Sequence, residues 1–537
     1  MTSTSQVITC KAVVCWKVGE GVKIEKIQVD PPKSTEVRLK MLCSSICHTD
    51  ISSIQGTPMF NFYPLALGHE GVGVVESVGD EVKSVKGGDM DVLQRPEAIS
   101  SFELRHVVRD SEYTVIDVNY LVKVDPSINP AHGSFISCGF STGYGAAWKE
   151  AKVESGSSVA VFAVVCWKVG EGVKIEEIQV DPPKSTEVRL KMLCSSICHT
   201  DITSIQGTPL FKFYPLALGH EGIGVVESVG DEVKSVKEGD MVIPVFVGEC
   251  KECENCISEK SNLCMTYPVR LTGLMLDNTS RMSCRGQRLY HTLSCATWSE
   301  YTVIDVNYLV KVDPSINPAH GSFISCGFSS GYGAAWKEAR VESGSSVAVF
   351  GLGAVGLGVI SAAKMLGATK IIGIDINDMK REKGEAFGMT HFINPSNSHK
   401  SSSALVKELS GGMGVDYSFE CTGVDPLLTE SLEATKVGSG KTIILGLGNE
   451  PYVSLGLFTI AFGRTLKGSM FGGLKPKSDL PILADKCINQ EFPLQELFTH
   501  EVQLTDIEQA FELLKQPNCV KVVIKIYYYS KNRIKKR

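Results

Sequence analysis

The chain has 537 residues, of which 43% are hydrophobic and 21% are charged, and its net charge is −6. This composition is typical of a globular protein with several domains, and it gives no reason to expect nucleic acid or an anionic membrane as a partner. The N-terminus MTSTSQVITC lacks the features of a signal peptide and no apolar run approaches membrane-spanning length, so we expect a cytoplasmic protein whose 18 cysteines serve as thiols or metal ligands.

A long segment occurs twice in the chain. Residues 12–90 recur almost unchanged as residues 163–241. The copies then diverge, rejoin at Glu112 and Glu300, and stay together until copy one stops at Phe162. We therefore interpret residues 1–162 (copy one) as a truncated duplicate of the segment that begins at Ala163 (copy two), without the cysteine-rich insert of copy two.

Each copy begins with apolar, β-branched runs, such as residues 187–193 and 222–229 in copy two. Pro-Pro, Gly-Thr-Pro and Gly-Asp turns separate these runs. The pattern predicts a small β-barrel domain in each copy.

Copy two contains three dispersed candidate metal ligands: Cys198 in SICHTD, His220 in GHE and Cys326 in ISCGF. A lone buried cysteine is usually a small hydrophobic residue, so each of these has a structural explanation when taken singly. Together they form a set of two thiolates and one imidazole with one coordination position left open. That set is typical of a zinc ion that polarises a substrate oxygen.

A second group of cysteines is closely spaced, at positions Cys250, Cys253, Cys256 and Cys264. Their neighbours are mainly Lys, Glu, Asn and Ser, which argues against four unconnected buried thiols. The spacing predicts a closed, four-cysteine structural zinc site.

A dinucleotide-binding pattern follows between residues 345 and 375. Residues 347–350 and 371–374 are predicted strands, and residues 354–366 have the apolar spacing of a helix. Between the first strand and the helix, Gly351, Gly353 and Gly356 form G-x-G-x-x-G, and Asp375 directly follows the second strand. The glycines allow the turn, the approach of a pyrophosphate and helix packing, while Asp375 suits the ribose diol of NAD and disfavours NADP.

Strands and helices continue to alternate after this pattern, as in a parallel sheet with crossover helices. Residues 415–420 and 441–447 are predicted strands, residues 506–515 an amphipathic helix, and residues 520–526 a last strand.

Residues 163–526 resemble the zinc-dependent medium-chain alcohol dehydrogenases, most closely the plant alcohol-dehydrogenase-like branch. The resemblance is carried by CHTD, LGHEG, the four-cysteine lobe, ISCGFSSGYG, GLGAVGLG and FGG. It implies a multi-domain α/β fold with a GroES-like β-barrel catalytic domain and a Rossmann domain with a doubly wound parallel sheet, preceded by an incomplete second GroES-like copy. The expected segments are the duplicate 1–162, the catalytic domain 163–327 with its lobe at about 248–265, the Rossmann domain 328–470, the return to the catalytic domain 471–526 and a basic tail 527–537.

The resemblance also implies site roles. Cys198, His220 and Cys326 would hold the catalytic zinc, with Glu221 behind the metal, and the four lobe cysteines would hold the structural zinc. Thr200 would relay the substrate proton. Cofactor contacts would come from the glycines and Asp375 together with His199 (phosphates), Val355 (nicotinamide), Lys380 (adenosine ribose) and Lys521 (pyrophosphate).

The expected reaction is NAD-dependent oxidation of primary or secondary alcohols to aldehydes or ketones, and its reverse. It proceeds by alkoxide formation at zinc and hydride transfer to the cofactor. The expected cofactors are NAD and two zinc ions per chain, and the expected assembly is a homodimer joined through the Rossmann sheets.

Three positions depart from the family pattern. Thr203 stands where many relatives have the histidine that ends the proton relay. Pro268 stands where glutathione-dependent formaldehyde dehydrogenases have an arginine, which argues against that substrate. Lys521 replaces an arginine and cannot bind pyrophosphate bidentately.

Copy one keeps Cys47, His69 and Cys138, with Thr49 and Glu70, but has no cofactor domain and no cysteine-rich lobe. We therefore expect no catalysis from it. Two other functions stay open: a lyase on the same scaffold with NAD as a fixed structural cofactor, and a catalytically impaired fusion product.

Overall fold

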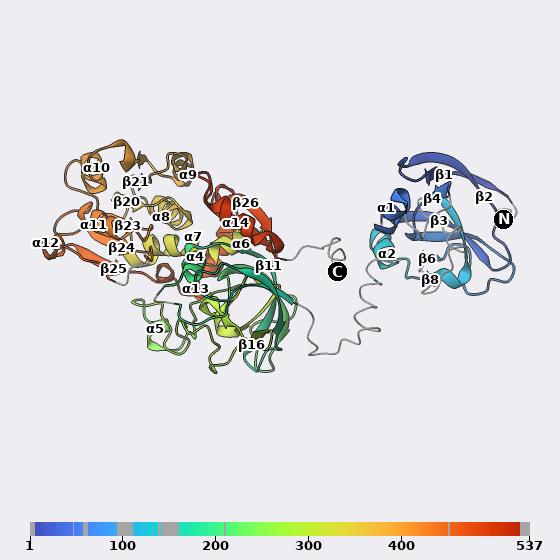
Figure 1. Cartoon of the computed structure of the whole chain (residues 1–537), viewed down its shortest axis with the longest axis horizontal. Helices are drawn as coiled ribbons and strands as arrows, with labels where there is room; N and C mark the ends of the chain where they lie inside the picture. Colours follow the sequence, from blue (N-terminus) through green and yellow to red (C-terminus); the bar gives the residue numbers. More distant parts are fainter. Residues whose placement is uncertain are drawn as a thin grey trace. The chain divides into compact units, whose positions relative to one another are not determined.

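The computed structural model describes residues 6–46, 48–56, 63–93, 111–137, 141, 161–208, 211–448 and 452–526. The chain divides into two compact units (Figure 1): Met1–Ser157 with Ser530–Arg537, and Ser158–Tyr529. Cys47, Cys138 and the basic tail 527–537 lie outside the described residues.

The first unit is a small β domain, as predicted for copy one. A three-stranded sheet has the order β2–β1–β4 and a five-stranded sheet has the order β7–β3–β5–β6–β8. A small core of five buried residues, Val37, Leu39, Val75, Val85 and Ile116, holds the larger sheet. The elements are β1 (Ile8–Cys15), β2 (Lys23–Val29), β3 (Glu36–Ser45), α1 (His48–Gln55), β4 (Leu65–Ala66), β5 (Glu70–Val78), β6 (Met90–Leu93), β7 (Tyr113–Asp117), β8 (Leu121–Lys123) and α2 (Pro130–Ile136).

The second unit begins with a larger barrel-like domain. Its described strands form two sheets, ordered β16–β15–β10–β9–β12–β17 and β19–β14–β13–β11–β27–β26, with β18 paired to β11. The elements are β9 (Val161–Cys166), β10 (Lys174–Val180), β11 (Glu187–Ser196), α4 (His199–Gln206), β12 (Leu216–Ala217), β13 (Glu221–Val229), β14 (Met241–Pro244), α5 (Glu254–Ile257), β15 (Met282–Cys284), β16 (Gln287–Arg288), β17 (Tyr290–His291), β18 (Tyr301–Asp305), β19 (Leu309–Lys311) and α6 (Pro318–Ile324).

The strand β9 begins at Val161, so Val161 and Phe162 belong to the second unit although their sequence is the end of copy one. The tail of copy one is a strand-forming sequence, and here it extends the first strand of the barrel by pairing with β10.

The Rossmann domain of the second unit is a parallel sheet with the order β22–β21–β20–β23–β24–β25. This is the classic doubly wound order. Its elements are α7 (Gly327–Gly333), β20 (Ser346–Phe350), α8 (Ala354–Met365), β21 (Lys370–Ile374), α9 (Lys380–Phe387), β22 (His391–Ile393), α10 (Ser402–Leu409), β23 (Tyr417–Glu420), α11 (Asp425–Glu433), β24 (Lys441–Ile444), α12 (Leu457–Ala461) and β25 (Thr465–Gly468).

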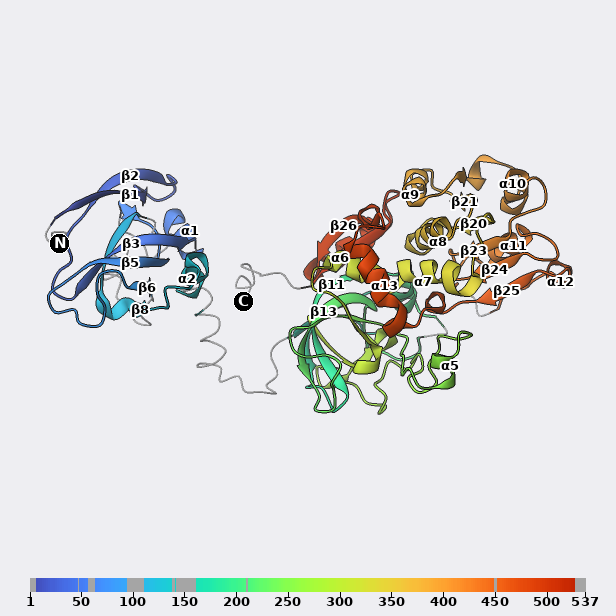
Figure 2. The ribbon, with the colours of Figure 1, turned by 180° about the vertical axis from the view of Figure 1, so that it is seen from behind.

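The C-terminal segment packs against the barrel of the second unit. It comprises α13 (Pro476–Ile488), β26 (Phe498–Gln503), α14 (Ile507–Leu514) and β27 (Lys521–Lys525). The strand β27 pairs with β11, and Figure 2 shows these red elements beside the green strands of the barrel. One continuous hydrophobic core includes residues of the barrel, the Rossmann domain and this segment, so the three parts pack together in one compact unit. No helix within the described ranges is long and apolar enough to cross a membrane.

Candidate active site and metal centres

The three dispersed ligand candidates converge in the second unit. Cys198 precedes α4, His220 precedes β13, and Cys326 precedes α7. Ligand atoms of these three residues and Glu221 all lie within 4.8 Å of one another. His220 is fully buried, and its Nε2 has no hydrogen-bond partner within the described part of the chain. A buried nitrogen of this kind, beside two thiols, is what a bound zinc ion would satisfy.

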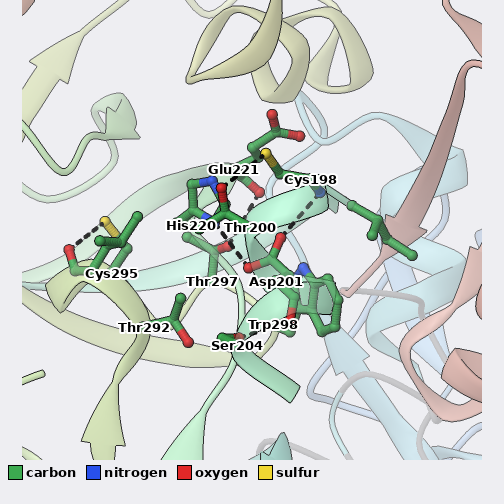
Figure 3. A network of polar contacts seen from close by, with 12 residues as sticks. Cys198, Thr200, Asp201, Ser204, His220, Glu221, Thr292, Cys295, Thr297 and Trp298 are labelled. Atoms are coloured by element: carbon green, nitrogen blue, oxygen red, sulfur yellow. Dashed lines mark hydrogen bonds and ion pairs between the residues drawn. The ribbon is translucent and has the colours of Figure 1, made fainter. Parts of the chain in front are cut away.

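Asp201 holds two of these ligands in place, and sequence reasoning did not single it out (Figure 3). Its Oδ2 accepts a hydrogen bond of 3.0 Å from the backbone N of Cys198, and its Oδ1 lies 2.9 Å from His220 Nδ1. Asp201 has no exposed surface. Since a carboxylate only accepts, Nδ1 carries a proton and Nε2 faces the metal position. The signal was present as the aspartate of CHTD, at the third position of the helix that Cys198 precedes.

Glu221 connects the metal site to the C-terminal strand. Its carboxylate accepts a 2.6 Å hydrogen bond from Ser196 Oγ and a 3.0 Å hydrogen bond from Gly327 N. The Lys521 ammonium, which is 4% exposed, donates to the same carboxylate and to the Ile197 carbonyl oxygen at 3.0 Å. Burial alone lowers the pKa of Lys521, but the Glu221 carboxylate raises it above its ordinary value. The predicted contact of Lys521 with a pyrophosphate stays a prediction.

The charges around the site favour metal binding by Cys198. A hydrogen bond from the Cys326 thiol and the positive charges of His220 and Lys521 hold the pKa of Cys198 well below its ordinary value. Burial lowers the pKa of His220, but Asp201 and the Cys198 sulfur raise it well above its ordinary value. A metal binds thiolate and neutral imidazole, so loading this site would release protons.

Thr200 lies beside the ligand set, as the relay prediction requires. Its Oγ1 is 3.8 Å from Cys198 Sγ, and its side chain is half-buried. The neighbouring His199 is exposed to solvent. The Thr203 hydroxyl donates to the Thr200 carbonyl oxygen at 3.1 Å, within its own helix, so it does not extend the relay in this arrangement.

The four lobe cysteines also meet. Their sulfur atoms lie within 4.8 Å of one another. Backbone N–H groups point at these sulfurs, with Cys253 N 3.2 Å from Cys250 Sγ and Tyr267 N 3.2 Å from Cys264 Sγ. Burial raises the pKa of Cys250, but the backbone N–H groups of Cys253 and Glu252 outweigh it and lower that pKa to about 6. Four thiols with amide donors fit a tetrahedral zinc.

The glycine pattern forms a turn between β20 and α8 that fits a phosphate. A Cβ at Gly356 would lie 1.9 Å from the Gly351 carbonyl oxygen, and Gly351 itself has φ +91°. Only glycine is tolerated at these two positions without rearrangement. A Cβ at Gly353 would meet nothing within 4 Å, so the backbone is open there at the start of α8. Open backbone at a helix N-terminus is suited to an anion.

Asp375 lies at the carboxyl end of β21, as predicted. Its Oδ2 accepts from Leu352 N at 2.8 Å and its Oδ1 accepts from Asn377 N at 3.0 Å, so the carboxylate is fixed beside the glycine turn. Val355 is the second residue of α8. Lys380 begins α9, is 9% exposed and donates to the Cys519 carbonyl oxygen. Its contact with a ribose stays a prediction.

Copy one retains part of the metal site. Asp50 Oδ1 lies 3.0 Å from His69 Nδ1, and Ser45 Oγ donates to Glu70 Oε2 at 2.5 Å, as their counterparts do in copy two. The two cysteines expected to complete that site are not among the described residues.

Two family descriptions match this chain. "Alcohol dehydrogenase GroES-like domain" matches residues 33–125 and 184–314, which lie in copy one and copy two, and "Zinc-binding dehydrogenase" matches residues 354–488.

Similar proteins cover about two thirds of the chain. "CYP enzymes assisting alcohol dehydrogenase" of Catharanthus roseus is 57% identical over 368 residues, which is 67% of this chain and 98% of that protein. "Alcohol dehydrogenase 1" of Artemisia annua is 54% identical over 366 residues, 68% of this chain and 97% of that protein. The crystal structure of benzyl alcohol dehydrogenase from Acinetobacter calcoaceticus aligns with a TM-score of 0.62 and 26% identity, over 69% of this chain and 100% of that chain.

Replacing the carboxylate that orients two ligands should loosen the metal. We expect Asp201→Asn to lower zinc affinity about 10- to 100-fold, because His220 and Cys198 lose their common anchor. The rate at which a chelator removes activity measures this. Asp50→Asn, the same change in copy one, is the matched control and should lose activity no faster than the unsubstituted chain; equal loss in both variants would contradict the assignment.

Two glycines of the turn should respond differently to the same substitution. Gly356→Ala should lower the free energy of unfolding by about 1–3 kcal/mol, because its Cβ overlaps the Gly351 carbonyl oxygen. Gly353→Ala should leave stability unchanged but weaken NADH binding, because the methyl group fills the open backbone. Denaturant unfolding and an NADH fluorescence titration distinguish the two effects. A Gly353→Ala variant that binds NADH normally would contradict the proposed cradle.

Proposed function

Because the chain belongs to the zinc-dependent medium-chain alcohol dehydrogenase family, we propose that it oxidises primary or secondary alcohols with NAD as the hydride acceptor, and catalyses the reverse reaction. The observation that carries this proposal is the junction at Gly327. A Cβ there would lie 3.1 Å from Glu221 Oε1 and 3.5 Å from the Cβ of Ala354, the first residue of α8. The metal ligands and the dinucleotide turn are thus adjacent, as hydride transfer from a metal-activated alcohol requires.

Zinc, when held by Cys198, His220 and Cys326, would supply Lewis-acid activation of the substrate oxygen. The chain's own residues would do the rest. Asp201 orients His220 and Cys198. Thr200, 3.8 Å from the Cys198 sulfur, would accept the substrate hydroxyl proton while its own hydroxyl proton passes toward the cofactor ribose. Glu221, neutralised in part by Lys521, would keep a negative charge behind the ligand set.

Asp375 supports the choice of NAD over NADP. Its carboxylate is fixed by two backbone N–H groups at the end of β21, where a ribose diol would meet it. A 2′-phosphate at that position would be repelled by the carboxylate. Every cysteine within the described ranges is a free thiol, which supports a reducing compartment such as the cytoplasm.

A homodimer through the Rossmann sheet is part of the proposal. The strand β25 is the last in the sheet order, and the neighbouring α12 leaves Leu457 76% and Phe458 70% exposed. Phe462, 59% exposed, stacks on Phe458. An open strand edge beside an exposed apolar cluster is typical of a twofold interface.

The function is tested by NADH formation from primary and allylic alcohols with the full chain, before and after zinc chelation. We expect zinc-dependent turnover with NAD and little with NADP. Thr200→Ala should lower kcat about 100-fold or more, since a positioned acid–base group contributes at least that much. Thr49→Ala, the same change in copy one, is the control and should have no effect.

No turnover from a chain that binds both NAD and zinc would overturn the dehydrogenase proposal. Carbonyl release from a cyanohydrin-type substrate without NADH formation would then identify the lyase. Absence of both reactions would identify an impaired fusion product.

The proposed dimer is tested with Leu457→Glu and Phe458→Glu together. We expect the molar mass from light scattering to fall to that of one chain, because two buried charges of each chain would face the same two of its partner across the twofold axis. Met413→Glu, at another position with 70% exposure, is the matched control and should leave the dimer intact. A dimer that survives the double substitution would place the interface elsewhere.

A further inference from the structure

Copy one and copy two contain one strand with the same ten residues and the same geometry. The strands β3 and β11 both read EVRLKMLCSS. The pairing of β3 with β5 has bulges at Arg38/Leu39 and Met41/Cys43, and the pairing of β11 with β13 has bulges at the equivalent positions. The far edges of β3 and β11 therefore present the same backbone groups in the same arrangement.

In copy two this edge is covered by the C-terminal strand. The residues Cys194, Ser195 and Ser196 of β11 pair with Lys525, Ile524 and Val523 of β27. The pairing is extended by hydrogen bonds from Ile197 N to the Val522 carbonyl oxygen at 3.3 Å and from Ile526 N to the Leu193 carbonyl oxygen at 3.2 Å. Ile197 is consequently only 3% exposed.

In copy one no strand within the described residues covers the corresponding edge. Among the described strands, β3 pairs with β5 and β7 alone. Ile46, the counterpart of Ile197, is 68% exposed, and Leu42, the counterpart of Leu193, is 46% exposed. Ile136 is 38% exposed, whereas its counterpart Ile324 is fully buried. We call Leu42, Ile46, Ile136 and the adjoining edge of β3 the open acceptor.

We propose that the open acceptor binds the C-terminal strand, residues 520–526, of a second copy of this chain. The occupant follows from the structure, because this segment already covers the identical strand in copy two with an observed register. Strand addition of this kind gives affinity through backbone hydrogen bonds and selectivity through alternate side chains. An incoming strand would also bring Lys521 toward Glu70, the counterpart of its partner Glu221.

Any exchange leaves one acceptor strand per chain without a partner strand. Each chain has two acceptor strands but one donor strand, so every exchanged β27 leaves an acceptor open on some chain. Exchange passed from chain to chain builds an open assembly, whereas reciprocal exchange between two chains closes as a dimer. Association through the open acceptor should therefore increase with protein concentration during folding, when β27 is not yet docked on β11.

A fluorescent peptide with the sequence of residues 520–526, VKVVIKI, tests the acceptor on the folded full-length chain. In the native fold β11 is occupied, so binding reports copy one. We expect saturable binding that Ile46→Lys weakens about tenfold or more, because the buried isoleucine surface is lost. The matched control is Ile24→Lys, on β2 of the same unit, where the isoleucine is 74% exposed. Equal binding of a scrambled peptide, or equal affinity of the two variants, would overturn the proposal.

Refolding of the full chain tests whether a second copy supplies the strand. Size-exclusion chromatography after refolding at increasing protein concentration should show a growing fraction of large assemblies, reduced by Ile46→Lys and unchanged by Ile24→Lys. The enzyme activity of the recovered single-chain or dimeric fraction should be equal in both variants, since copy one is outside the catalytic machinery. Assemblies that form equally in both variants would exclude strand exchange at this edge.

Discussion

The structure depends on the close packing of two helices, α7 and α8, which places the candidate ligand Cys326 beside the glycine turn. A Cβ at Gly331 would lie 1.8 Å from the Val355 carbonyl oxygen, and a Cβ at Gly358 would lie 2.2 Å from the Phe328 carbonyl oxygen. Neither helix could approach the other so closely with a larger residue at these positions. Because Cys326 directly precedes α7 and the glycine turn directly precedes α8, this packing sets the separation between the two halves of the site.

The metal site itself is organised by buried charge. Asp201, Glu221 and Lys521 are all within 4% of full burial. Removing such groups from water is costly unless each is paired, and here each has charged or backbone partners. The benefit is orientation: Asp201 directs the imidazole of His220, while Glu221 joins three separate elements through Ser196, Gly327 and Lys521. Burying these charges costs folding free energy, and in return the ligand side chains are held in a fixed orientation.

The spacing of apolar residues along the chain correctly predicted the strands and the helix around the glycine turn. The strands at 347–350 and 371–374 are present as β20 and β21, and the helix of residues 354–366 is present as α8, one residue shorter. Both cysteine groups converge as their spacing and chemistry predicted. The missed features depend on tertiary contacts. Asp201 meets His220 across 19 residues, and Lys521 meets Glu221 across 300, distances over which no periodicity carries information.

The duplication shows the same limit within one chain. The sequence EVRLKMLCSS forms a strand with the same bulges in both copies, so local sequence and its immediate partners determine the strand and its register. Burial is decided elsewhere: Ile197 is 3% exposed because β27 lies over it, while Ile46 is 68% exposed. The sequence of copy one thus determines its own sheets, but copy one contains no counterpart of β27, the strand that covers this edge in copy two. A GroES-like copy without its C-terminal return leaves one sheet edge to a partner, and the partner that we propose is the strand β27 of a second copy of the chain.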